Sequence, residues 1–89
     1  MSSLYLQITY RHGKPFAAYI SFPHPPGTRS VRTEQVNPEL VVDYAADGSP
    51  LGIEIVSPGH VSLAEINAVF DNLGISRPAA SDLEPLRAA

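Results

Sequence analysis

The sequence predicts an α+β fold, in which an antiparallel β-meander of four to five strands is closed by one C-terminal helix packed on one face. Apolar residues alternate in several short segments, which is typical of half-buried strands. An Asp-Gly pair between two of these segments predicts a tight hairpin, and a later segment has the apolar spacing of an amphipathic helix. Together these observations predict a sheet, a helix and one core between them.

The first hairpin is predicted from residues 4–10 and 16–22, where apolar side chains alternate along the chain. Between them lie Gly13 and Pro15, two residue types that are common in turns. An odd-numbered loop centred on Gly13 would set Tyr10 opposite Phe16 and keep the apolar residues on one face. The other pairs on that face would be Ile8 with Ala18, Leu6 with Ile20, and Leu4 with Phe22.

A second hairpin is predicted from residues 40–44 and 51–55, which alternate in the same way. Asp47 and Gly48 tolerate the positive φ of a two-residue type I′ turn. This turn would set Tyr44 opposite Leu51, and the next pairs would be Val42 with Ile53 and Leu40 with Ile55. A proline-rich loop at 23–27 precedes a third strand at 28–36, whose pairing the pattern leaves open.

A helix is predicted to begin after Ser62, because Ser62 and Glu65 have the spacing of a capping box. Gly74 suits the position that follows the helix. We expect one domain at residues 1–75, followed by a Pro- and Ala-containing tail at 76–89 that forms a short helix or a loose end. The apolar stripe of the helix consists of Leu63, Ile66, Val69, Phe70 and Leu73.

The composition argues against several classes of protein. The chain has 89 residues, no cysteine, and a formal charge of −3 from 6 basic and 9 acidic residues. Disulfides and thiolate metal sites are therefore excluded, and a nucleic-acid partner is not expected without a basic face. No apolar run approaches the ~20 residues that span a membrane, and the N-terminus does not resemble a signal peptide. We expect a cytoplasmic protein.

The chain resembles the bacterial domain of unknown function 2283 family over roughly residues 4–57. The resemblance depends on the strand Val41-Val42-Asp43-Tyr44, the turn Asp47-Gly48 and the strand Leu51-Gly52-Ile53-Glu54-Ile55, in this order. It implies the fold of the family. It implies no catalytic residue, because none is assigned to the family.

Asp43 and Glu54 are the candidate ligand-binding residues, because the predicted hairpin places both on the face opposite the apolar row. Two carboxylates on one face suit acid–base chemistry or a hard cation, although acids on a solvated face are also ordinary. The three histidines, His12, His24 and His60, lie in predicted loops without the spacing of a metal motif. We expect no catalytic residue, no metal site and no cofactor.

The second face of the predicted sheet is only half polar. Tyr5, Tyr19, Val41 and Val56 are its candidate interface residues. Aromatic side chains are enriched where proteins meet, although a solvated sheet with a few exposed tyrosines would have the same pattern.

Three functions remain open. The first is a non-enzymatic protein-interaction or self-associating module, with a homodimer or another protein as partner. The second is a small-ligand binder or enzyme that uses Asp43 and Glu54. The third is an antitoxin-like regulator, against which the negative charge and the lack of a helix-turn-helix pattern both argue.

Overall fold

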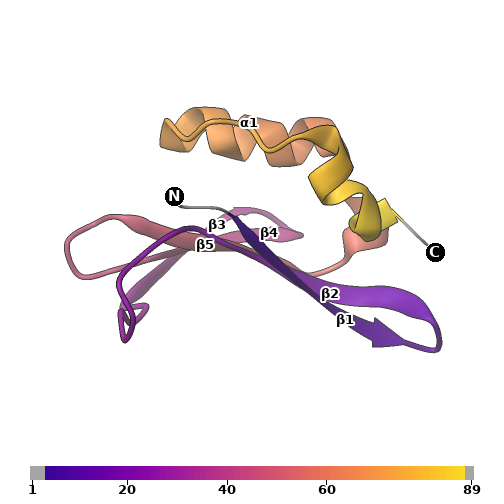
Figure 1. The fold of residues 1–89 in the computed structure, drawn as a ribbon, viewed down its shortest axis with the longest axis horizontal. Helices are drawn as coiled ribbons and strands as arrows, with labels where there is room; N and C mark the ends of the chain where they lie inside the picture. The colour runs from indigo at the N-terminus through magenta and orange to yellow at the C-terminus, as the bar shows by residue number, and fades with distance from the viewer. Residues whose placement is uncertain (1–3, 88–89) are drawn as a thin grey trace.

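The computed structural model describes residues 4–87 as a two-layer α+β fold, which confirms the predicted class. One layer is a five-stranded antiparallel sheet, and the other contains the helix α1 and a C-terminal 3-10 helix, η2, on the same face of the sheet (Figure 1). The strands are β1 (Tyr5–Arg11), β2 (Lys14–Ser21), β3 (Arg32–Asn37), β4 (Leu40–Tyr44) and β5 (Pro50–Ile55). The helical elements are η1 (Pro58–His60), α1 (Leu63–Leu73) and η2 (Ala80–Arg87).

The strand order is β1-β2-β5-β4-β3, which differs in one place from a simple meander. The third strand does not pair with β2. It crosses to the far edge, and β5 returns to pair with β2 through Ala18 opposite Ile55 and Ile20 opposite Ile53. The sheet is thus a two-stranded hairpin joined edge to edge to a three-stranded meander. The proline-rich loop explains the crossing, because prolines cannot continue a hydrogen-bonded ladder.

The β1–β2 hairpin has the predicted pairs of Leu6 with Ile20 and Ile8 with Ala18, but the predicted loop is wrong. A two-residue turn at His12 and Gly13 replaces the odd-numbered loop, and both residues have positive φ, of 55° and 78°. This is the geometry of a type I′ turn. The extra residue appears instead as a bulge at Phe16 in β2, where Tyr10 pairs with Pro15 and Thr9 with Ala17.

The β4–β5 hairpin shows the converse error. Val42 pairs with Ile53 and Leu40 with Ile55 as predicted, but the turn is not type I′. The Gly48 N–H donates to the Ala45 carbonyl, and Gly48 alone in this turn has positive φ, of 89°. This is a three-residue turn that ends in a left-handed glycine. The additional turn residue makes Tyr44 pair with Pro50 instead of Leu51.

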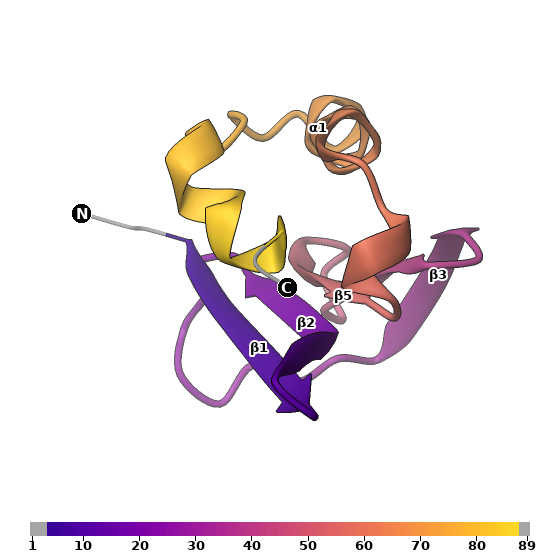
Figure 2. The same ribbon diagram turned by 90° about the vertical axis from the view of Figure 1, so that its right-hand side faces the viewer.

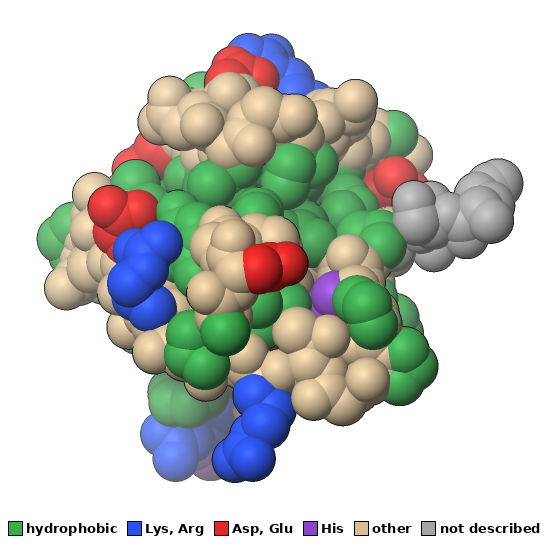
Figure 3. Space-filling view, turned by 90° about the vertical axis from the view of Figure 1, so that its left-hand side faces the viewer, with side chains coloured by type: hydrophobic (Ala, Val, Ile, Leu, Met, Phe, Trp, Pro, Cys, Tyr) green, Lys and Arg blue, Asp and Glu red, His purple; other side chains and the backbone are tan. Residues whose placement is uncertain are grey.

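The helix α1 begins and ends as predicted. The Ser62 Oγ accepts a hydrogen bond from the Glu65 N–H at 3.1 Å, and Glu65 Oε1 accepts one from the Ser62 N–H at 2.8 Å. Gly74 follows the helix in the left-handed conformation, with φ of 71°. Ile66, Val69 and Phe70 are the buried residues of α1, and the Phe70 ring meets Phe22 edge to face at 5.5 Å between centroids. Figure 3 shows hydrophobic side chains between the two layers at the left-hand end of Figure 1.

The C-terminal tail contributes to the core. Within residues 76–89, η2 packs over the β1–β2 side of the sheet while α1 covers the β5–β4–β3 side (Figure 2). Leu83 and Leu86 are only 3% and 5% exposed, and both belong to the same core cluster as the sheet and α1. Of the two possibilities that the sequence left open, the structure has the short helix. The division into a domain of residues 1–75 and a tail stays a prediction.

Candidate functional site

The site is built on the sheet face that points away from α1 and η2, which we call the open face. No described helix or strand packs against it (Figure 1). Because side chains alternate along each strand, the pairing of the strands assigns the residues of this face. They are Tyr5, Gln7 and Thr9 of β1, Ala17, Tyr19 and Ser21 of β2, Gly52 and Glu54 of β5, Val41 and Asp43 of β4, Thr33 and Gln35 of β3, and Val56 after β5.

Gly52 lies at the centre of the open face, paired with Ser21 on one side and Asp43 on the other. It is buried although it has no side chain of its own. The ring of Tyr19 lies over it, so that an added Cβ would stand 2.5 Å from Tyr19 Cζ and 2.5 Å from the Ile20 carbonyl oxygen. Tyr19 therefore fills the space that the glycine leaves beside Asp43.

Tyr19 crosses β5 to reach Asp43. Its hydroxyl donates a hydrogen bond to Asp43 Oδ2 at 3.1 Å. Both side chains are half-buried. Asp43 is therefore held by a strand two positions away in the sheet, and this contact connects β2 to β4 across Gly52.

Burial, followed by the charge of Asp43, the hydrogen bond to it and the charge of Glu54, raises the pKa of the Tyr19 hydroxyl well above its ordinary value. The hydroxyl therefore stays protonated at neutral pH and acts as a donor. A general acid or base works best with a pKa near the working pH. This arrangement suits a structural contact on the sheet and not proton transfer.

Glu54 lies on the same face, as predicted, and is exposed. It pairs with Tyr19 on one side and with Val41 on the other, which places it diagonally from Asp43. The two candidate acids share a face, but they are not directly opposite each other. Among residues 4–87, no group of three His, Cys, Asp or Glu side chains is placed to hold a metal ion.

The four candidate interface residues differ in exposure. Tyr5 is 63% exposed and Val56 48% exposed, whereas Tyr19 and Val41 are half-buried. Tyr19 already has contacts within the chain, to Gly52 and Asp43. The accessible apolar surface of the open face therefore lies at Tyr5 on the β1 side and at Val56 beyond the end of β5.

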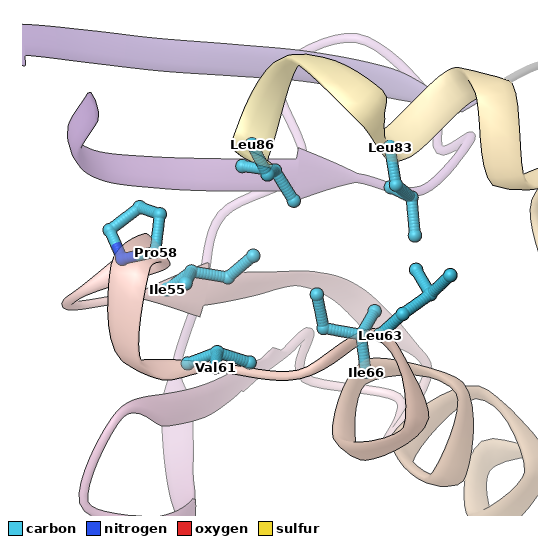
Figure 4. Close-up of a pocket in the computed structure, with 7 residues that line it drawn as sticks. All are labelled: Ile55, Pro58, Val61, Leu63, Ile66, Leu83 and Leu86. Atoms are coloured by element: carbon cyan, nitrogen blue, oxygen red, sulfur yellow. The ribbon is translucent and has the colours of Figure 1, made fainter. Parts of the chain in front are cut away.

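Three pockets of the described residues lie away from Asp43 and Glu54. A small apolar pocket of about 10 Å³ lies where β5, η1, α1 and η2 meet, and it is lined by Ile55, Pro58, Val61, Leu63, Ile66, Leu83 and Leu86 (Figure 4). That volume is close to the least that holds a single water molecule. Two open grooves, of about 400 and 350 Å³, flank η2 and α1 on the other side of the sheet from Asp43 and Glu54.

The contact between Tyr19 and Asp43 was not predicted from the sequence, because it depends on the long-range pairing of β2 with β5. One signal pointed toward it. A glycine in the interior of a strand often marks a place where another group approaches closely, and Gly52 is such a glycine.

Among residues 4–87, no helix is long and apolar enough to cross a membrane.

Comparison with known protein families gives a match to part of the chain. Residues 17–57 match the model of a family described as a protein of unknown function (DUF2283). The matched segment runs from β2 to just past β5 and contains Tyr19, Asp43, Gly52 and Glu54, whereas β1, α1 and η2 lie outside it. No curated protein and no solved structure matches the chain. Over just under half of its length, therefore, the chain resembles the family of unknown function DUF2283.

Proposed function

We propose that the chain is a non-enzymatic protein-interaction module that self-associates through its sheet. The observation that carries this proposal is Tyr5, an aromatic side chain that is 63% exposed on the β1 side of the open face, where no described helix or strand packs. Aromatic residues are enriched at protein interfaces. A domain of this size also gains much from additional burial, because a short chain buries a smaller share of its surface on folding.

The geometry of the acids favours this proposal over a small-ligand site. Ligand sites are concave, and their few polar groups converge on the ligand. Asp43 is bonded to Tyr19 and Glu54 stands exposed on a sheet surface, while the residues that line the two open grooves include neither of them. The open face therefore suits contact with another protein surface better than binding of a small ligand.

The test compares two lysine substitutions at exposed apolar positions. Tyr5→Lys places a charge on the open face, whereas Val36→Lys places one on β3, beside α1, where Val36 lines a groove with Val69 and Leu73. Sedimentation velocity over a series of concentrations measures association of each variant. We expect Tyr5→Lys to weaken association at least tenfold, and Val36→Lys to associate like the unmodified chain.

Hydrogen–deuterium exchange of the unmodified chain at low and high concentration adds a direct map of the contact. We expect peptides from the strands of the sheet to gain protection on association. Protection gained in η2 alone, with association insensitive to Tyr5→Lys, would contradict the proposal and assign the contact to the tail.

A further inference from the structure

We propose that two copies of the chain associate by antiparallel pairing of their β1 strands, with Ile8 of one copy opposite Ile8 of the other. This inference rests on the proposed function, self-association through the sheet, and names the strand that forms the contact. Its result would be one sheet that continues from one copy into the next. A two-fold axis through the Ile8 pair and perpendicular to the sheet would keep the open faces of both copies on one side.

Among residues 4–87, the strand order leaves two edges, β1 and β3, whose outward backbone groups have no strand beside them. Such edges pair with other chains unless something prevents it, and charged side chains are a common protection. In β3, Arg32 and Glu34 are charged and every residue but Val36 is polar. In β1, Leu6, Ile8 and Tyr10 alternate, and Arg11 at the end is the one charged residue. The protected edge is β3, and β1 is the edge that is open to pairing.

The apolar side of β1 is also incomplete within one copy. Leu6 and Ile8 are only half-buried although they face the core, and Tyr10, which pairs with Pro15 and not with Phe16, is 54% exposed. A groove of about 400 Å³ lies beside Leu6, between the first hairpin and the tail. A strand added next to β1 would cover these side chains and extend the apolar face of the sheet.

The register follows from the symmetry of the strand. Tyr5–Arg11 has 7 residues with Ile8 at its middle, so a two-fold axis there pairs the whole strand, whereas an axis at Gln7 or Thr9 leaves two residues of each strand unpaired. On the core side, Leu6 would face Tyr10 of the second copy. A register shifted by one residue would set open-face residues of one copy opposite core-face residues of the other.

The charges fit this register. On the open face Tyr5 would face Arg11 of the second copy, and a guanidinium beside an aromatic ring is a favourable contact. Arg11 already lies over the Phe16 ring in its own copy, at 4.6 Å from the ring centre, so its guanidinium is held near this end of the strand. Because β1 has no other charge, the pairing sets no like charges against each other. The strand therefore complements itself, which identifies a second copy as the partner.

The chain has no cysteine, so cross-linking through introduced cysteines can test which residues of the two copies lie opposite each other. Opposed residues of an antiparallel pair have Cα atoms about 4.5–5.5 Å apart, within the range that a disulfide spans. Two single variants, Tyr5→Cys and Arg11→Cys, are prepared separately, mixed under mild oxidation and separated on a non-reducing gel. We expect the mixture to form a cross-linked dimer at least tenfold more than either variant alone, since identical residues at the strand ends would lie about 20 Å apart.

Ile8→Cys tests the centre of the same register, because it should cross-link without a second variant. Thr33→Cys on the β3 edge is the matched control and should not cross-link. Cross-linking of Thr33→Cys in place of Ile8→Cys would overturn the proposal and assign the contact to β3. Because Tyr5 and Arg11 are exposed, the mixing experiment still decides the question if Ile8→Cys fails to fold.

Failure of the inference can be told apart from failure of the proposed function. If the unmodified chain sediments as a dimer and neither the mixture nor Ile8→Cys cross-links, the β1 register is wrong while self-association stands. Val56→Lys then shows whether the contact lies on the open face away from β1, since Val56 follows β5, the third strand from that edge. A chain that is monomeric at every concentration would contradict both.

Discussion

Replacing Gly52 with alanine is expected to destabilise the fold strongly, although the change adds a single methyl group. The added Cβ would stand 2.5 Å from Tyr19 Cζ and from the Ile20 carbonyl oxygen, closer than carbon atoms approach in real structures. The ring can rotate away only by giving up its hydrogen bond to Asp43. The carbonyl belongs to the neighbouring strand, so the pairing of β2 with β5 must also shift.

The magnitude follows from overpacking. Forcing an extra carbon into a packed site costs about 1–3 kcal/mol, and the neutral hydroxyl bonded to a carboxylate adds about 1 kcal/mol if it is lost. We therefore expect Gly52→Ala to cost roughly 2–4 kcal/mol of unfolding free energy. For a domain of this size each kcal/mol lowers the melting temperature by about 4–8 °C.

The assay is urea denaturation followed by circular dichroism, with Gly59→Ala as the matched control. At Gly59 the added Cβ would have no heavy atom within 4 Å, so Gly59→Ala should leave the free energy of unfolding unchanged or raise it slightly. In a Tyr19→Ala background, Gly52→Ala should lower the free energy of unfolding by less. The loss that remains is due to the clash with the Ile20 carbonyl oxygen. Equal stability of the two alanine variants would refute the placement of Tyr19 over Gly52.

Four further predictions concern the core and its surroundings. Ser62→Ala should cost about 0.5–2 kcal/mol through loss of the helix cap, measured by denaturation. Phe70→Ala should lower the free energy of unfolding by about 3–5 kcal/mol because its ring is fully buried, and an unchanged value would show that α1 does not pack in the core. Leu83→Ala should cost about 2–5 kcal/mol, against no change for exposed Ser81→Ala, and equal values would separate the tail from the core. Burial and Asp43 raise the pKa of the Tyr19 hydroxyl in the folded chain above its ordinary value of 10, so the unfolded chain loses this proton at lower pH than the folded chain. The contribution of Tyr19 to the free energy of unfolding is therefore complete below pH 10 and declines above it. Thermal melts at alkaline pH should show a smaller decline in stability for Tyr19→Phe.

The two hairpins show which parts of a fold a pattern can predict. Alternation identified the strands and the pairs at their centres, such as Val42 with Ile53, because the burial of one face sets the register there. Both turns were wrong by one residue. Asp47 and Gly48 are compatible with a two-residue and a three-residue turn alike. In the structure the turn has three residues, and a bulge at Leu51 lets Tyr44 pair with Pro50 while Asp43 still pairs with Gly52.

The long-range contacts could not be predicted in the same way. The pairing of β2 with β5 joins segments about 30 residues apart, and no local pattern specifies it. The contact between Tyr19 and Asp43 follows from that pairing. Leu83 and Leu86 were missed as core residues because Pro85 and the surrounding alanines obscure any helical spacing, and their burial depends on the space left over β1 and β2.

Sedimentation equilibrium of the unmodified chain tests the central claim, self-association through the sheet, most directly. One chain has a mass of 9.6 kDa. We predict that the measured mass rises with concentration toward twice that value, and that Tyr5→Lys returns it to the mass of one chain while Val36→Lys does not. A mass that stays at 9.6 kDa at every concentration would contradict the account.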